Sequence, residues 1–291
     1  SLTANSPQTG YDFAGWTVKI NGVPMTDNPA QMFGDINAMT TSFTMPEGNV
    51  TLTATYRQHE YAVGLALGKA KVNGVEVTKA HYGDTVTIVA DTPAAGMQFT
   101  GWNVKTGDGI VLGNINSSVT TFTMVAQDIS IEATYDFARY NVIVNNGACN
   151  KDTAIKGDFV TLDGTPKTGY EFVSWTVNSN NVTLSSLTEL HATFTMPAAD
   201  VEITANFKQI DYTLTLSNAT ANKTTGLHFE DVVTITADAP AAGFVFDKWI
   251  VSGGGAEIVR ENDATTTFIM PPANVTIAAT YKLAPYAITV S

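Results

Sequence analysis

The sequence predicts an all-β protein made of a tandem array of small β-rich modules of about 70 residues each. The first observation is a phrase, Gly-x-x-Phe-x-x-Trp, which occurs four times, at residues 10–16, 96–102, 169–175 and 243–249. The second is a Phe-x-Met phrase that follows each copy. The third is a closing segment in which apolar and polar residues alternate before a final aromatic residue, as in a half-buried strand. Repetition of all three indicates one small fold used four times.

Each module is predicted to contain five strands, which the third copy shows most clearly. Residues 140–144 (Tyr-Asn-Val-Ile-Val) alternate in polarity, and the turn residues Asn-Asn-Gly follow them. We expect further strands at residues 159–162, 172–177, 194–196 and 201–207. Their aromatic and β-branched residues suit a pleated, half-buried surface.

A four-residue loop separates the fourth and fifth predicted strands in every copy. It reads Pro-Ala-Ala-Asp at residues 197–200, and its counterparts are residues 46–49, 125–128 and 271–274. Proline interrupts a ladder of hydrogen bonds, and the final Asn or Asp favours a turn. The loop therefore predicts a β-hairpin.

The repeat sets the expected module boundaries. Module 1 comprises residues 1–56 and is incomplete at its N-terminus, module 2 residues 61–135, module 3 residues 140–207 and module 4 residues 212–281. Residues 286–291 match the first strand of a truncated fifth module, so we expect the chain to be part of a longer protein. The joints between modules are short and contain no Gly or Ser run, which predicts limited flexibility. Aromatic pairs that flank them, such as Tyr56 with Tyr61, are expected to pack between neighbouring modules.

Module 1 contains additional residues between its tryptophan and its Phe-x-Met phrase. In residues 28–36, Asn28 stands at a possible helix N-cap and Pro29 at the first helical position. Apolar residues follow at helical spacing. We expect one or two helical turns, which would form either a binding loop or part of a repacked terminal module. An alternative for the whole array is β-grasp-like modules with short helices.

Composition excludes several functional classes. The net charge is −12 with 15 basic residues, and no basic stripe is present, so we expect no nucleic acid partner. No apolar run is long enough to predict membrane insertion. The composition, 44% hydrophobic and 14% charged, is typical of a folded chain.

The sequence contains no constellation typical of catalysis or metal binding. Cys149 is the single cysteine and is expected in a turn, without an activated thiol. The four histidines (His59, His81, His191 and His228) occupy unrelated places in the repeat, and acidic pairs such as Asp27 with Asp35 lack the spacing of a calcium loop. We therefore expect no enzyme activity, no cofactor, no metal, and no catalytic or cofactor-binding residues. The four tryptophans are expected in the core rather than at a sugar site.

The repeated phrases resemble a known family. The pattern Tyr-x-Val-x-Val, Gly-Asp-x-Val-Thr-Ile, Gly-Tyr-x-Phe-x-x-Trp and Phe-Thr-Met-Pro is similar to the divergent internalin B-repeat modules of bacterial surface proteins, relatives of the Listeria-Bacteroides repeat. The resemblance covers nearly the whole chain. It departs at Val125, where the other copies have proline, and at Ser174 and Lys248, where two copies have glycine. It implies an extracellular location on the bacterial surface and carries over no catalytic residue.

Three functional hypotheses follow. The first is a stalk or spacer that projects a head domain from the cell. The second is an adhesive array whose loops bind a host protein or glycan, with avidity from repetition. The loops between Trp and Phe differ in every copy, which favours the spacer, because a repeated site is expected to repeat its residues. The third is a fibre of strand-exchanged subunits, in which residues 286–290 add to module 1 of a neighbour; otherwise we expect a monomer.

Overall fold

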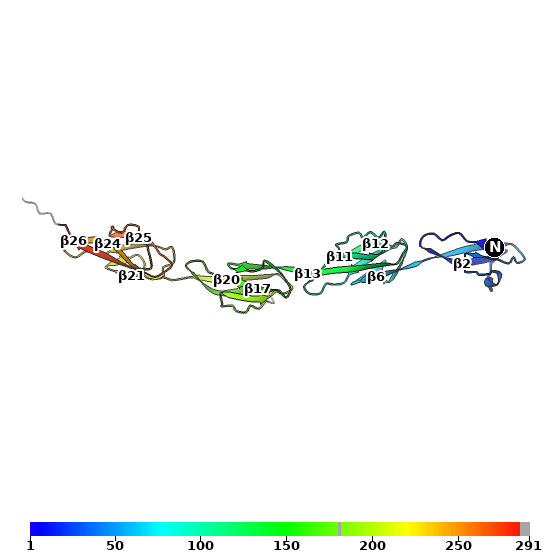
Figure 1. Ribbon diagram of the computed structural model, residues 1–291, viewed down its shortest axis with the longest axis horizontal. Coiled ribbons are helices and arrows are strands. Elements are labelled where there is room, and N and C mark those ends of the chain that lie inside the picture. The colour runs from blue at the N-terminus through cyan, green and yellow to red at the C-terminus, as the bar shows by residue number, and fades with distance from the viewer. Residues whose placement is uncertain (180–181, 286–291) are drawn as a thin grey trace, which may run out of the picture. The chain divides into compact units, whose positions relative to one another are not determined.

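A computed structural model describes residues 1–179 and 182–285. The chain divides into two compact units, residues 1–138 and 139–291, and each is described by itself. Figure 1 shows unit 1 in blue to green and unit 2 in green to red. The predicted fifth-module strand at residues 286–291 lies outside the described residues.

Unit 1 contains modules 1 and 2. The elements of module 1 are β1 (Leu2–Thr3), β2 (Tyr11–Ile20), β3 (Val23–Pro24), the 3-10 helix η1 (Pro29–Met32), β4 (Thr40–Thr41) and β5 (Val50–Gln58). Module 2 contributes β6 (Glu60–Ala66), β7 (Gly68–Val72), β8 (Val75–Val77), β9 (Lys79–His81), β10 (Thr85–Ala90), β11 (Met97–Thr106), β12 (Val119–Thr123) and β13 (Ile129–Phe137). The all-β prediction is confirmed.

Unit 2 contains modules 3 and 4. Module 3 comprises β14 (Arg139–Asn145), β15 (Ala148–Cys149), β16 (Thr153–Ile155), β17 (Phe159–Asp163), β18 (Tyr170–Val177), β19 (His191–Thr195) and β20 (Val201–Gln209). Module 4 comprises β21 (Leu214–Ser217), β22 (Ala219–Ala221), β23 (Val232–Ala237), β24 (Phe244–Gly253), β25 (Thr265–Ile269) and β26 (Val275–Leu283). The five predicted strands of module 3 are all present. The exact module boundaries stay a prediction.

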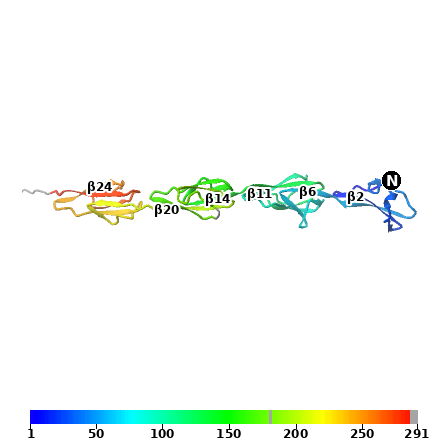
Figure 2. The same ribbon diagram turned by 90° about the horizontal axis from the view of Figure 1, so that it is seen from below.

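Modules 2 to 4 each consist of two β-sheets (Figures 1 and 2). In module 3 one sheet has the order β16-β14-β20-β18 and the other β15-β17-β19. The first strand, β14, pairs in parallel with the last, β20, while β18 pairs with β20 from the other side in an antiparallel manner. The last strand is therefore central to its sheet. Its first five residues alternate between buried and more exposed positions because one face of the sheet covers the core.

The predicted hairpin between the fourth and fifth strands is wrong. In module 3, β19 pairs with β17, whereas β20 pairs with β14 and β18, so the loop at 197–200 connects the two sheets. The same separation holds for β12 and β13 in module 2 and for β25 and β26 in module 4. The loop keeps its turn residues because the chain still reverses direction there. It connects strands of two different sheets, one on each side of the core, and those strands do not pair with each other.

The chain also changes sheets directly after the first strand, at a residue in the left-handed region. That residue is Leu67 in module 2 (φ 58), Asn146 in module 3 (φ 60) and Asn218 in module 4 (φ 57). The two asparagines donate from Nδ2 to backbone carbonyls of the last strand, at Ala205 and Ala279. Leucine makes no such bond, and its side chain is 54% exposed. A branched apolar residue at positive φ is unfavourable, whereas asparagine tolerates it.

Replacing Leu67 by asparagine is therefore expected to stabilise module 2. Relief of the left-handed penalty and one new hydrogen bond together predict a gain of about 1–2 kcal/mol. The reciprocal change, Asn218→Leu, should destabilise module 4 by a similar amount. Urea unfolding of both variants measures the effect, and a loss of stability in Leu67→Asn would contradict this account of the sheet switch.

Each module has its own hydrophobic core, enclosed between its two sheets. In module 3 it contains Val160, Trp175, Phe194 and Ile203, each contributed by a different strand. Equivalent clusters occupy modules 2 and 4, and a smaller one occupies module 1. The phrase Phe-x-x-Trp keeps both aromatic rings on the core side because a β-bulge between Phe172 and Ser174 shifts the register by one residue.

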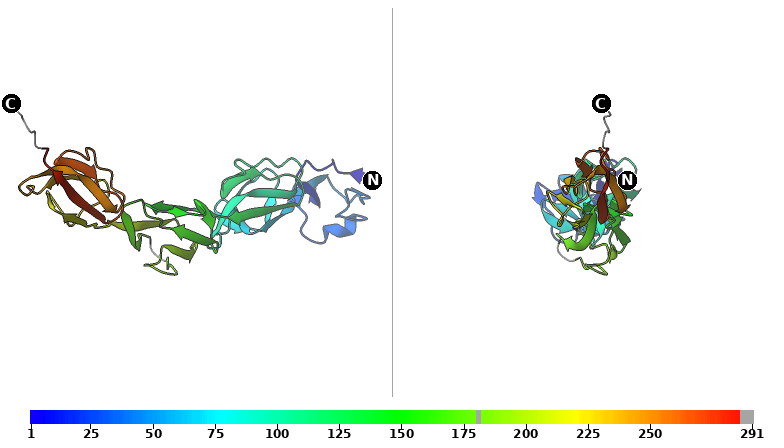
Figure 3. Two further views of the ribbon diagram at one scale, coloured as in Figure 1. Left: turned by 60° about the vertical axis from the view of Figure 1, so that its left-hand side comes forward. Right: turned by 90° about the vertical axis from the view of Figure 1, so that its left-hand side faces the viewer.

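Module 1 departs from the others in the way the sequence predicts. The helical turn expected in residues 28–36 is confirmed as η1, visible near the N-terminus in Figure 3. Asn28 is confirmed at the N-cap position, with proline at the start of the helix, but it adopts the left-handed conformation and its side chain makes no capping hydrogen bond. In modules 2 to 4 no helix lies among the described residues, so the alternative of modules with short helices does not hold there.

The prediction that aromatic pairs pack across the joints is corrected by the structure. Tyr56 packs edge-on against Phe13 of its own module, with ring centroids 5.9 Å apart, and donates a hydrogen bond to the Asn5 carbonyl. Tyr135, Phe207 and Tyr281 make the equivalent ring contacts within their modules. Tyr61 packs against the core of module 2. These aromatic residues pack within their own modules, and the contacts across the joints are made by other residues.

Candidate functional site

The four tryptophans belong to the cores, as predicted. Trp102, Trp175 and Trp249 are 3% exposed and Trp16 is 9% exposed. Each indole Nε1 donates to a carbonyl of the following loop, at Ala38, Ser117, Glu189 or Asp263, over 2.8–3.0 Å. The tryptophan thus holds the end of the loop that varies between copies, two residues before the next strand begins, and its ring is packed in the module core.

A cavity of about 470 Å³ brings Cys149, His191 and Asp163 into one lining, a set that suggests a nucleophile, a base and an orienting acid. Cys149 lies opposite Leu162, and His191 lies opposite Asp163, at the adjacent register positions of the same sheet. Neighbouring positions on a strand face opposite sides, so the thiol faces the core and the imidazole faces away from it. Burial raises the pKa of the Cys149 thiol. Cys149 belongs to strand β15, not to the predicted turn, and this cluster is not arranged for catalysis.

Each histidine has an aspartate partner. The separations are 2.7 Å for His59–Asp12, 3.5 Å for His81–Asp84, 3.6 Å for His191–Asp163 and 3.1 Å for His228–Asp211. These are separate pairs, and across residues 1–179 and 182–285 no group of three or more potential ligands could hold a metal ion. Of the acids weighed as calcium ligands, Asp35 accepts a hydrogen bond from the Asn37 backbone.

The aspartate before the second strand has a structural role. Asp84, Asp158 and Asp231 each accept a hydrogen bond from a backbone N–H three residues earlier, at His81, Ile155 and His228. This bond closes the turn that leads into the second strand. This hydrogen bond accounts for the repeated aspartate, so no bound ligand is needed to explain its recurrence.

Lys151 also donates to Asp158, over 2.9 Å, and this bond holds the pKa of the Asp158 carboxyl below its usual range. Because the folded pKa is the lower one, the pair stabilises module 3 above the ordinary carboxyl pKa of about 4. That contribution is lost as the pH falls through the folded value. Lys151→Met is expected to raise the Asp158 pKa toward its usual value in a carbon-detected NMR titration. Lys167→Met serves as the control, and an unchanged Asp158 pKa in Lys151→Met would contradict the pairing.

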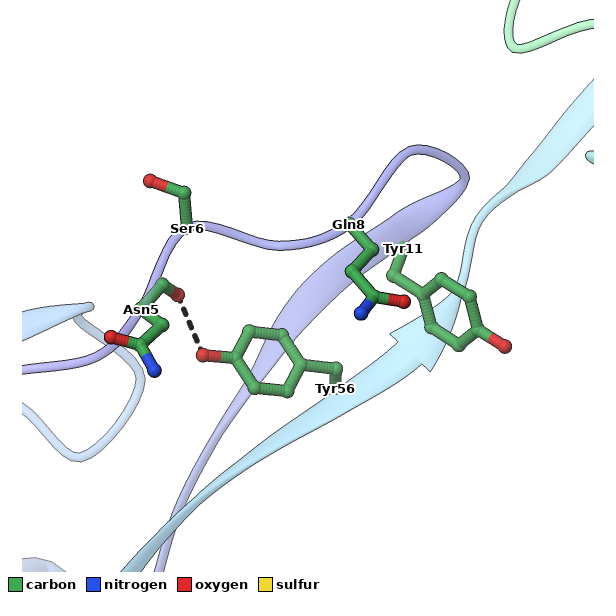
Figure 4. A pocket seen from close by; sticks show the side chains of 5 residues that line it. All are labelled: Asn5, Ser6, Gln8, Tyr11 and Tyr56. Atoms are coloured by element: carbon green, nitrogen blue, oxygen red, sulfur yellow. Dashed lines mark hydrogen bonds between the residues drawn. The ribbon is translucent and has the colours of Figure 1, made fainter.

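The open groove of module 1 is the first of two related candidate binding surfaces. Its volume is about 460 Å³, and its lining consists of Asn5, Ser6, Gln8, Tyr11 and Tyr56. In Figure 4 the Gln8 side chain extends between the rings of Tyr11 and Tyr56, and Tyr56 Oη bonds to the Asn5 backbone. Tyr11 is 41% exposed. The groove therefore offers one accessible aromatic ring surrounded by polar side chains.

Module 3 has a groove at the same place in the repeat. Thr165, Lys167, Tyr170 and Phe207 occupy the positions of Ser6, Gln8, Tyr11 and Tyr56. The volume is about 310 Å³, and Tyr170 is 40% exposed. Sequence reasoning missed both grooves, because the tyrosine is also an ordinary residue at the start of a strand. A signal for the grooves was present in the sequence. Modules 1 and 3 both have a Gly-Tyr pair and, two residues after the closing aromatic residue, a glutamine (Gln58 or Gln209).

The joint within each unit is closed by a glycine against an aromatic ring of the next module. A Cβ added at Gly10 would lie 2.6 Å from Cβ of Tyr82, and one added at Gly169 would lie 2.6 Å from Cβ of Phe229. The same glycines accept hydrogen bonds from the joint, from His59 N over 2.8 Å and from Ile210 N over 2.9 Å. In each joint, a backbone hydrogen bond therefore ties a joint residue to the preceding module, and an aromatic residue of the following module packs against the same glycine.

The comparison with protein families agrees with this repeated architecture. A model described as the divergent InlB B-repeat domain matches residues 1–60, 65–139, 140–211 and 212–285. The chain belongs to this family. Divergent InlB B-repeats are associated with bacterial surface and extracellular proteins.

Two further findings concern this InlB B-repeat array. A comparison with proteins of curated function finds no match. Within the part of the chain that the structure describes, no helix has the length and hydropathy required to cross a membrane.

Proposed function

We propose that this divergent InlB B-repeat array is a non-catalytic stalk region of a bacterial surface or secreted protein, which holds a head domain away from the cell. The observation that carries the proposal is the in-unit joint. Only His59 separates β5 from β6, and the glycine contacts with Tyr82 and Phe229 leave little room for the modules to bend. A spacer requires this resistance to bending, because a flexible tether contracts.

Small-angle X-ray scattering across a concentration series tests the spacer. A module of about 70 residues has a radius of gyration of about 11 Å, so four in line predict a maximum dimension above about 110 Å. We expect this value to be independent of concentration. A more compact particle would contradict the spacer, and a particle that grows with concentration would favour the strand-exchange fibre.

A second candidate function is an adhesive array. The observation that favours it is the pair of equivalent grooves in modules 1 and 3, because two related sites on one chain gain avidity for a repeating ligand. Spacing and adhesion are compatible, since the grooves lie beside the joints and do not open the cores.

A further inference from the structure

The tyrosine of each groove lies beside an in-unit joint and has a glutamine as its neighbour on the last strand of the module. Tyr11 stands directly opposite Gln58 in the β2–β5 ladder, and Tyr170 stands directly opposite Gln209 in the β18–β20 ladder. Directly opposite residues of an antiparallel pair project from the same face of the sheet. Each tyrosine ring therefore has a primary amide next to it, which can both donate and accept hydrogen bonds.

The next module supplies a second aromatic residue at each of these joints. Tyr82 and Phe229 are equivalent in the repeat, and each contacts the glycine that precedes the groove tyrosine. In unit 2 a cavity of about 400 Å³ extends along this contact and is lined by Lys167, Tyr170, Gln209 and Phe229 among others. Lys167 and Tyr170 also line the groove of module 3, so both residues belong to the lining of both cavities.

Modules 2 and 4 carry different residues at the equivalent positions. In place of the tyrosine, module 2 has Met97 and module 4 has Phe244. In place of the glutamine on the last strand, they have Phe137 and Leu283. In place of Gln8 or Lys167, they have Ala94 and Ala241. All three exchanges remove hydrogen-bonding groups while keeping the strand. The polar character of the set in modules 1 and 3 is therefore not required by the fold.

We propose that Tyr11 and Tyr170 are stacking platforms for neutral hexose units of a glycan chain. An exposed tyrosine ring offers an apolar face to the C–H groups of a sugar, and its hydroxyl remains in water. Gln58 or Gln209, with Gln8 or Lys167, supplies hydrogen bonds to sugar hydroxyl groups. The lining of the joint cavity in unit 2 includes Lys167 and Glu230, whose opposite charges favour a neutral ligand over an anion.

The shape of the grooves favours a glycan over a peptide. Both are open surface grooves that combine one exposed ring with amide and hydroxyl side chains. Side chains that anchor a protein partner are typically buried in desolvated pockets, whereas a pyranose ring needs an accessible aromatic face with polar groups at its edge. Two such sites on one chain suit a polymer of repeating units.

Isothermal titration calorimetry of the full chain with maltohexaose, cellohexaose, laminarihexaose, mannohexaose and chitohexaose tests the proposal. At least one sugar is expected to bind with a Kd of about 0.1–10 mM per site, typical of a single stacking contact. Tyr11→Ala/Tyr170→Ala should weaken that binding at least about tenfold. Met97→Ala/Phe244→Ala alters the equivalent positions of modules 2 and 4 and should leave it within about twofold.

The proposal is overturned if none of the five sugars binds at about 10 mM, or if the double tyrosine variant binds as the parent does. Because both tyrosines are well exposed, the variant should keep its fold, and Gln58→Ala/Gln209→Ala provides an independent set of changes that should also weaken binding. Chemical shifts that move only outside modules 1 and 3 on sugar addition would likewise overturn it. The spacer function does not depend on this result, since scattering tests it separately.

Discussion

Trp175→Ala is expected to unfold module 3 at ambient temperature while the other modules stay folded. The indole is 3% exposed within the module core, and its Nε1 holds the Glu189 carbonyl at 3.0 Å. Truncation of a buried tryptophan costs about 3–5 kcal/mol, and a core of about 70 residues has little stability beyond that. Hydrogen exchange followed by mass spectrometry should show loss of protection in residues 140–207 alone.

Phe159→Ala is the matched control in the same module. Phe159 begins β17, but its side chain is 60% exposed, so its removal should change stability by at most about 0.5 kcal/mol. Equal effects of the two changes would contradict the assignment of the tryptophan to the core. Loss of protection that spreads through all modules in Trp175→Ala would contradict independent cores.

Gly169→Ala is expected to destabilise unit 2 and loosen the joint between modules 3 and 4. The new methyl group would lie 2.6 Å from Cβ of Phe229, and the residue has a φ of +83. The left-handed backbone costs about 1–2 kcal/mol for alanine, and the steric overlap adds about 1–3 kcal/mol. Urea unfolding measures the sum.

Gly157→Ala separates the two contributions. Gly157 has a φ of +91 but no atom within 4 Å of an added Cβ, so only the backbone term of about 1–2 kcal/mol is expected. In the double variant Gly169→Ala/Phe229→Gly the overlapping Cβ of residue 229 is absent, so the two changes should be clearly non-additive. Additive effects, or equal effects of Gly157→Ala and Gly169→Ala, would show that the contact with Phe229 does not close the joint.

The strands of this fold were predictable from the sequence because they rest on local signals. Alternation of polarity in residues 201–207 and the spacing of Phe172 and Trp175 identify half-buried strands directly. The pairing of those strands was not predictable in the same way. The loop at 197–200 has the same turn chemistry whether its flanking strands pair or lie in different sheets, and the parallel pairing of β14 with β20 joins segments far apart in the chain. The change of sheet at Asn146 could not be distinguished from an ordinary turn, because a residue in the left-handed conformation is typical of both structures.

The candidate binding surface was missed for a similar reason. Variation of the loops after each tryptophan argued against a repeated site, and those loops do vary. The residues that repeat are instead on the strands, where Tyr170 and Gln209 are far apart in sequence and become neighbours only through the strand register. The contact of Gly169 with Phe229 links different modules, so no pattern within one copy could indicate it.

The most direct test of the stalk proposal is the stiffness of an in-unit joint, measured by electron-electron double resonance between two spin labels. After Cys149→Ser removes the single native cysteine, Phe159→Cys and Ile269→Cys place labels on exposed strand positions of modules 3 and 4. A variant with a Gly-Ser insertion after Ile210 provides the flexible reference. The account predicts one narrow distance distribution for the native joint and a broad one for the insertion variant. A native distribution as broad as the reference would contradict it.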